Sequence, residues 1–89
     1  MQTIHFVEKG PNGKDIFGDY SFSNPNGKLV IFCHGFKGFK DWGHFNLIKK
    51  HWVDLGYRFL KFNFSHNGVT PQTPEFFSDL QAFGQNDYI

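Results

Sequence analysis

The longest uninterrupted run of apolar residues in the chain is Leu29–Cys33. This run lacks the in-and-out alternation of a half-covered strand, so it predicts a central β-strand that is covered on both faces. A second apolar segment at 57–64 predicts another strand. Gly27 and Gly35 lie close to the ends of the first segment, and Gly56 and Ser65 flank the second, which favours strand ends at those points.

Apolar residues recur at helical spacing between these two segments. One face of the expected helix carries Phe45, Ile48, Trp52 and Leu55. Asp41 is a suitable N-cap, and Gly56 stands where a glycine often ends a helix. Residues 29–64 therefore predict a β–α–β unit with parallel strands and a right-handed crossover.

The first part of the chain predicts an antiparallel hairpin. Segments 3–7 and 16–22 read as strands, and a Gly-Pro-Asn-Gly turn separates them. Gly18 interrupts the second strand and is expected to mark a bulge. A short helix is expected to start at Pro74. The predicted fold class is α/β, with an antiparallel edge hairpin, then a parallel β–α–β unit with its helix on one face.

The composition narrows the class of protein. Eighty-nine residues predict a single domain, 1–89, and a net charge of +1 provides no field for nucleic acid or an anionic membrane. The lone cysteine excludes an internal disulfide and suits a reducing compartment. No segment has the apolar length that spans a bilayer, and we expect a cytoplasmic protein without membrane contact.

The segment after the central strand carries a family resemblance. His34-Gly35-Phe36, a further glycine at Gly38 and a following helix resemble the start of the α/β-hydrolase superfamily, especially its serine aminopeptidase, esterase and dienelactone-hydrolase-like members. The resemblance covers about residues 14–89. It implies that the Phe36 backbone N–H contributes to an oxyanion hole, in a loop shaped by His34, Gly35 and Gly38. The alternative is a plain strand-to-helix connection whose glycines adopt positive φ.

The residues that would complete a serine hydrolase are absent from this chain. No Gly-x-Ser-x-Gly sequence occurs, and the resemblance implies that nucleophile, acid and base all follow the strand at 57–64. We therefore expect an incomplete domain, comprising strands 1–4 and the first helix. It would be the N-terminal section of a hydrolase for an ester, thioester or peptide. Such a section has no triad residue and no cofactor, and is inactive alone.

Other reactive residue types point to structure rather than chemistry. Cys33 and His34 are neighbours on a strand and should face opposite ways, which favours a buried structural cysteine over a dyad. His44 and His51 are too far apart for a helical zinc pair, so no metal site is expected. A modest lysine cluster (Lys37, Lys40, Lys49 and Lys50) suggests a phosphate or nucleic acid, but the near-zero net charge argues against it.

A second function class remains open. The chain could be a small non-enzymatic α/β module whose many aromatic residues bind a ligand or partner. In either case, a strand like Leu29–Cys33 lacks its next parallel neighbour in this chain. Such an open edge predicts self-association, or a partner that supplies the missing strands.

Overall fold

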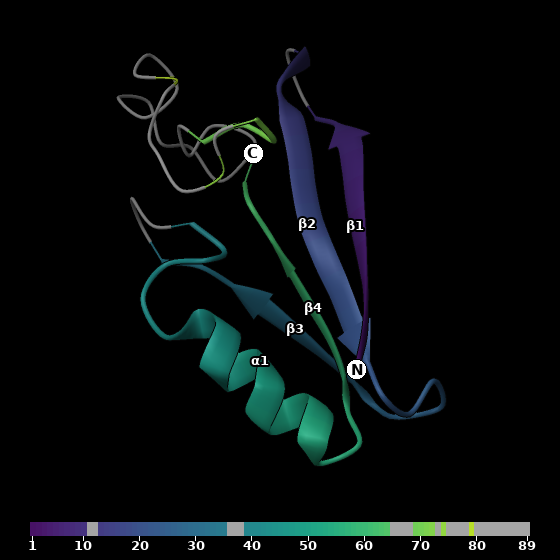
Figure 1. Cartoon of the computed structure of the whole chain (residues 1–89). Coiled ribbons are helices and arrows are strands. Elements are labelled where there is room, and N and C mark those ends of the chain that lie inside the picture. The colour runs from purple at the N-terminus through teal and green to yellow at the C-terminus, as the bar shows by residue number, and fades with distance from the viewer. Residues whose placement is uncertain (11–12, 36–38, 65–68, 73, 75–78, 80–89) are drawn as a thin grey trace.

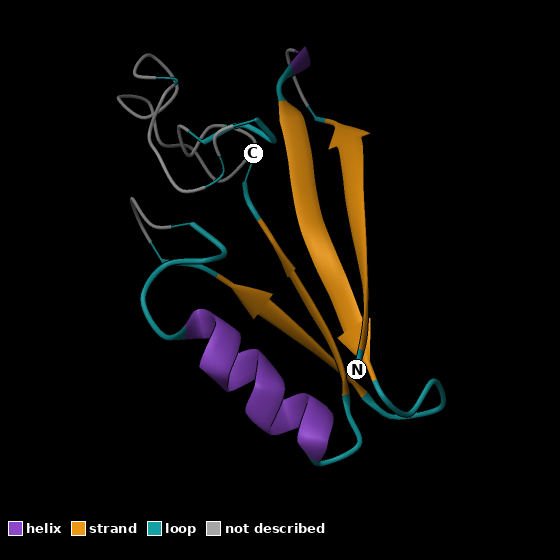
Figure 2. Ribbon diagram, in the orientation of Figure 1, coloured by secondary structure: helices purple, strands orange, loops and turns teal. Residues whose placement is uncertain are grey.

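The computed structural model describes residues 1–10, 13–35, 39–64, 69–72, 74 and 79, and within them the chain forms a small α/β fold (Figure 1). Its elements are β1 (Gln2–Lys9), β2 (Asp15–Phe22), β3 (Leu29–Cys33), α1 (Phe45–Asp54) and β4 (Arg58–Phe62). The four strands make one mixed sheet in the order β1-β2-β4-β3. Figure 2 shows α1 beside β3 and β4, away from β1.

The strand pairing confirms the predicted fold class. β1 and β2 pair antiparallel along their whole length, from Gln2 opposite Phe22 to Lys9 opposite Asp15. β3 and β4 pair in parallel, and α1 connects them. β2 joins the two units by pairing antiparallel with β4. The tip of the hairpin turn at 11–12 and most of the helix expected from Pro74 lie outside the described residues.

The prediction that Leu29–Cys33 is a central, fully covered strand is wrong for this chain. β4 lies between β2 and β3, so β3 stands at the edge of the sheet formed by the described strands. Leu29 and Ile31 are 43% and 58% exposed, and Cys33 is exposed as well, not buried as expected. An apolar run shows only that a strand is suited to burial. It does not supply the neighbours that bury it.

The helix begins later than the sequence suggests. Its N-cap is His44, which makes no side-chain capping bond, while the expected cap Asp41 is engaged in ion pairs instead. At the other end, Gly56 adopts φ 90°, a left-handed conformation that suits glycine, as predicted. The Asp41 cap prediction failed because two lysines compete for the same carboxylate.

The buried face of α1 differs in part from the predicted one. Phe45 and Trp52 are half-buried as expected, but Ile48 and Leu55 are exposed, and Val53 is the buried residue. A helix that starts near residue 45 and covers one narrow strand pair buries only a thin strip. The rest of its apolar surface stays in solvent.

Gly18 does not mark a bulge. The register runs regularly through it, with Phe6 opposite on β1 and Phe62 opposite on β4. A Cβ built on Gly18 would lie 2.4 Å from the Lys61 carbonyl oxygen and 2.7 Å from the Phe6 ring. The glycine is therefore required because neighbouring groups approach its backbone closely.

Within the part of the chain that the structure describes, no helix has the length and apolarity needed to cross a bilayer.

Candidate functional site

The carboxyl ends of β3 and β4 meet at one edge of the sheet, where ligands of open α/β folds often bind. His34 and Gly35 directly follow β3, and Asn63 and Phe64 directly follow β4. The structure thus places two of the predicted site residues at this edge. The other two, Phe36 and Gly38, lie outside the described residues, so the expected oxyanion N–H stays a prediction.

His34 ties the two strand ends together. Its side chain is buried, and its Nε2 accepts a hydrogen bond from the Phe64 backbone N–H at 3.2 Å. An accepting Nε2 carries no proton, so the proton is on Nδ1, which donates to the Gly35 carbonyl oxygen at 2.9 Å. Burial lowers the pKa of His34, and the Gly35 hydrogen bond offsets this only in part. His34 is therefore a neutral positioning residue, whose two ring nitrogens already have partners.

Cys33 and His34 do not form a dyad. Cys33 is exposed on one side of the edge strand, while the next residue, His34, is buried on the other. This is the alternation expected of neighbouring strand residues. Gly35 is exposed and is not among the described glycines with positive φ, and no atom of the described residues lies within 4 Å of where its Cβ would stand. Gly35 therefore lacks the positive φ that the plain-connection alternative expects of the loop glycines, and Gly38 lies outside the described residues.

Asn63 anchors the second half of the loop that follows β3. The side chain is fully buried, and its Oδ1 accepts a hydrogen bond from the Lys40 backbone N–H at 2.8 Å. The Asn63 backbone N–H in turn donates to the Phe17 carbonyl oxygen on β2 at 2.8 Å. The segment that joins β3 to α1 is therefore held at both ends, by His34 and by Asn63.

A cluster of buried charges lies under this loop, and sequence reasoning missed it. The charge cluster consists of Asp19 on β2, Lys61 on β4, Lys49 on α1, and Lys40 and Asp41 before α1. Three ammonium groups against two carboxylates leave one positive charge. Asp19 and Lys61 are 1% and 0% exposed. Ions buried to this extent are stable only when paired.

The pairing within the charge cluster is dense. Asp19 Oδ2 accepts hydrogen bonds from Lys61 Nζ at 2.8 Å and from Lys40 Nζ at 2.9 Å. Asp41 accepts from the same two ammonium groups, with Oδ1 2.5 Å from Lys61 Nζ and Oδ2 2.6 Å from Lys40 Nζ. Lys49 lies at the margin, with Nζ 3.7 Å from Asp19 Oδ1. The cluster thereby joins two strands to the loop before α1.

The pKa values of the charge cluster reflect this pairing. Burial raises the pKa of Asp41, but hydrogen bonds and charge from Lys40 and Lys61 outweigh it and lower the pKa to about 2. The pKa of Asp19 is lowered by the same two lysines against an opposing effect of burial. Burial lowers the pKa of Lys40, yet the two carboxylates raise it on balance. Asp19, Asp41 and Lys40 therefore stay ionised over the whole neutral range.

The described members of the lysine cluster that suggested a phosphate or nucleic acid pair with carboxylates. Lys40 is buried and Lys49 is mostly buried against carboxylates, while Lys50 is exposed and pairs with Asp54 at 2.6 Å. Lys37 lies outside the described residues. A sequence signal was present at Lys61, which follows Phe59 and Leu60 and precedes Phe62 on β4.

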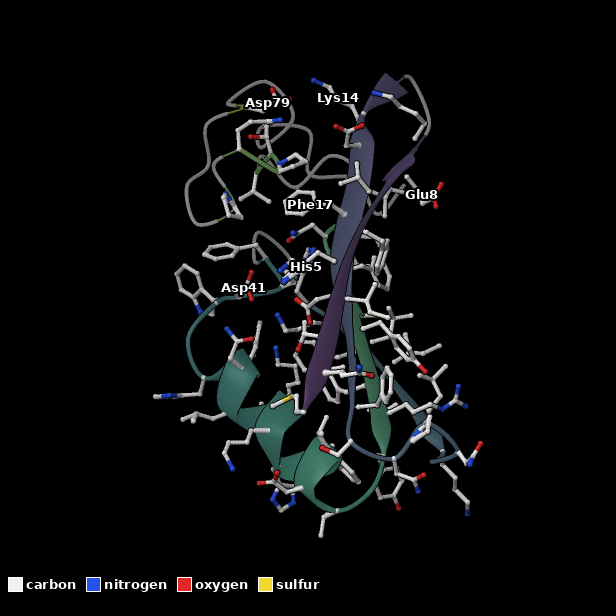
Figure 3. All side chains as sticks on the ribbon, turned by 45° about the vertical axis from the view of Figure 1, so that its right-hand side comes forward. His5, Glu8, Lys14, Phe17, Asp41 and Asp79 are labelled. Carbon is white, nitrogen blue, oxygen red and sulfur yellow. The ribbon has the colours of Figure 1, made fainter. Side chains whose placement is uncertain are left out.

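A cavity of about 500 Å³ opens beside the charge cluster. Its walls combine polar groups from Asp19, Lys40, Asp41, Asn46 and Lys49 with apolar ones. The apolar walls and the rim come from His5, Phe6, Val7, Phe17, Gly18, Pro71 and Pro74. In Figure 3, His5, Phe17 and Asp41 lie on one side of the β1–β2 hairpin and Glu8 on the other. The volume is in the range of small-molecule sites.

The remaining serines and histidines lie apart from the charge cluster in the described residues. Ser21 is fully buried and its Oγ contacts Thr3 Oγ1 at 3.0 Å, while Ser23 is exposed in a turn. Ser65 and Ser78 lie outside the described residues. His44 and His51 are exposed, and no group of three His, Cys, Asp or Glu side chains in the described part could hold a metal ion.

Comparison with known proteins provides a fold relationship. No family model and no curated protein matches the chain. Among solved structures, the chain is similar to DcsB, determined as a complex with its substrate analogue, with a TM-score of 0.60 and 18% identity. The match covers 75% of this chain and 22% of DcsB, so the likeness is to a small part of that protein. At this identity it indicates a shared fold alone.

Proposed function

We propose that this chain forms the N-terminal section of a serine α/β hydrolase that transfers the acyl group of an ester, thioester or peptide to water. In this proposal the chain contributes the oxyanion loop after β3, and a longer protein contributes the reactive serine, the acid and the base. By itself the chain has no hydrolase activity. The lone cysteine, Cys33, suits a reducing cytoplasmic setting.

One observation carries the proposal. The His34-Gly35 sequence follows the carboxyl end of a parallel strand, and His34 and Asn63 hold the loop on each side of Phe36. Backbone N–H groups stabilise an oxyanion only when their positions are fixed before the reaction. The contacts at His34 and Lys40, on either side of the undescribed residues 36–38, support the proposal.

The open edge of β3 is the second support. The described strands leave one edge of β3 unpaired, and the strand is apolar and parallel to β4. Parallel sheets are normally extended and covered on both faces. A further parallel strand beside β3 would bury Ile31 and would place the next strand-to-helix turn beside the His34-Gly35 loop.

The coding sequence beyond Ile89 provides the first test. The proposal expects an in-frame continuation that encodes a Gly-x-Ser-x-Gly motif, whereas a stop codon directly after Ile89 would contradict it. In the longer protein, Phe36→Pro removes the backbone N–H and Phe36→Leu retains it. We expect Phe36→Pro to lower kcat by about 10²–10³-fold and Phe36→Leu to have little effect. Equal activity of the two variants would exclude the oxyanion role.

A non-enzymatic binding module is the second candidate function. The cavity beside the charge cluster favours it, because a pocket with polar and apolar walls can bind a ligand without a nucleophile. Specific ligand binding by an 89-residue protein whose gene ends at Ile89 would favour this candidate over the hydrolase.

A further inference from the structure

One face of the sheet is apolar and uncovered. Residues that pair directly across strands project their side chains to the same face. The register therefore places four apolar or aromatic side chains in one row across all four strands: Ile4, Tyr20, Leu60 and Ile31. No side chain of this row is buried, and Ile4 and Ile31 are 54% and 58% exposed. We call the face that carries this row the open face.

The helix covers the opposite face of the sheet. Successive residues of a strand alternate between the faces, so Asp19, Lys61 and Phe32 point away from the open face. Phe32 packs against Phe45 of α1 with ring centroids 4.6 Å apart, and Asp19 and Lys61 are buried. Among the described elements, none lies over the open face. A sheet face that is apolar and lacks a second layer is typical of an interface.

Charged side chains of opposite sign lie at the two ends of the open face. Glu8 is on the same face as Ile4, and Figure 3 shows it on the opposite side of the hairpin from His5. Arg58 Nη1 donates a hydrogen bond to the Tyr20 hydroxyl at 3.4 Å. β1 and β4 run in the same direction, since both are antiparallel to β2. Glu8 near the end of β1 and Arg58 at the start of β4 are therefore at opposite ends.

This distribution of charge makes the open face self-complementary. Within the described part of the chain, Glu8 and Arg58 form no ion pair. A two-fold rotation about an axis in the plane of the face exchanges its two ends. It brings the carboxylate of each copy to the guanidinium of the other, as an isologous dimer requires.

The dimensions of the open face limit the strength of such a contact. Four strands about 4.8 Å apart, rising about 3.3 Å per residue, give a face of roughly 20 by 20 Å. Two such faces in contact bury on the order of 1,000 Å², at the low end of specific interfaces. The size predicts a reversible dimer rather than an obligate one.

We propose that the open face binds a second copy of this chain, with Glu8 of each copy beside Arg58 of the other. The side chains of the row from Ile4 to Ile31 form the centre of the interface, and the charged groups form its rim. The proposal does not rest on the hydrolase function, since it uses neither the loop at 34–38 nor a serine. It also differs from pairing at the open edge of β3, which would leave Ile4 exposed.

A matched pair of lysine variants tests the proposal on the 89-residue chain. Ile4 and Val7 lie on the same strand and are both 54% exposed, but Val7 is on the face of α1. In sedimentation equilibrium, Ile4→Lys should raise the dimer dissociation constant at least about tenfold, because it places a charge in the interface. Val7→Lys should leave this constant unchanged. A monomeric wild type, or equal constants for the two folded variants, would overturn the proposal.

NMR locates the interface without a substitution. In ¹H–¹⁵N spectra recorded over a dilution series, we expect concentration-dependent shifts at Ile4, Tyr20 and Leu60 and constant signals along α1. Shifts confined to β3 would place the association at its open edge and would overturn the proposal.

The rim charges have a test of their own. Glu8→Gln removes one partner of each proposed pair and should raise the dimer dissociation constant about threefold at low salt. The control Asp54→Asn removes an exposed carboxylate on α1 and should leave the constant unchanged. Equal constants for Glu8→Gln and the wild type would exclude the pairing of Glu8 with Arg58.

Discussion

Asp19 and Lys61 face each other on neighbouring antiparallel strands, with Lys61 Nζ 2.8 Å from Asp19 Oδ2 and both side chains buried. Each also contributes to a wider network, because Lys40 bonds Asp19 and Asp41 bonds Lys61. This ion pair connects the hairpin to the β–α–β unit at the centre of the sheet. Among the described residues, the centre of the sheet thus contains buried charges beside buried apolar side chains such as Phe59.

Breaking this ion pair should be strongly destabilising. In Asp19→Asn or Lys61→Met, the remaining buried charges lose a counter-charge, and the free energy of unfolding should fall by about 3–5 kcal/mol. The exposed pair Lys50–Asp54 provides the control, since Asp54→Asn should lower the free energy of unfolding by less than about 1 kcal/mol. Urea unfolding of the variants measures the difference. Similar losses for the buried and the exposed pair would contradict the structure.

Acid should reveal the contribution of Asp41. Its pKa is about 2 in the folded chain against 3.8 in the unfolded one, so the stabilisation is complete above pH 3.8 and is lost as the pH falls through about 2. This pKa shift of Asp41 corresponds to a contribution of about 2 kcal/mol to the free energy of unfolding. Urea unfolding between pH 2 and 7 should show this difference between wild type and Asp41→Asn, shrinking toward pH 2. A difference that grows on acidification would refute the assigned pairing.

His34 predicts a separate pH dependence. Its pKa is lowered by burial below 6.5, so the unfolded chain binds the proton more readily, and stability should fall as the pH drops from about 6.5. Replacing it in His34→Gln should abolish this slope, while His44→Gln at an exposed site should retain it. Long-range ¹H–¹⁵N NMR should also show the proton on Nδ1. A proton on Nε2 would rule out the bond from Phe64.

Two glycines make a matched test of close packing. Gly18→Ala places a Cβ 2.4 Å from the Lys61 carbonyl oxygen, which is a backbone atom and cannot move aside alone. The substitution should lower the free energy of unfolding by about 1–3 kcal/mol. Gly35→Ala adds a Cβ that no atom of the described residues approaches within 4 Å, and should leave the free energy of unfolding almost unchanged. Thermal or urea unfolding distinguishes them. A tolerated alanine at Gly18 would show that the strands around it are further apart.

The open edge of β3 predicts association of the isolated chain. Ile31 on this strand is 58% exposed. Replacing it by lysine should disfavour association, because a lysine on an edge strand hinders pairing with a strand of another chain. Sedimentation velocity should show association of the wild type and a marked reduction in Ile31→Lys. As a control, Leu47→Lys on the outer surface of α1 should leave association unaltered. A wild-type chain that stays monomeric at high concentration would count against an available edge.

The local pattern of residues determined a good part of this fold. Apolar runs, turn residues and helical spacing predicted the hairpin, the parallel β–α–β unit and the glycine that ends α1, because each depends on neighbours within about one element. The position of His34-Gly35 between a strand and a helix was predicted for the same reason. The functional role of Phe36 remains a prediction.

The tertiary structure alone decided which residues meet. The placement of β4 between β2 and β3 made Leu29–Cys33 an edge strand and exposed Cys33. It also brought Asp19 beside Lys61, 42 positions further along the chain. Strand order depends on the free energy of the whole sheet rather than on any one segment. For that reason the buried charges, the displaced helix cap at Asp41 and the cavity beside them could not be predicted from residue spacing.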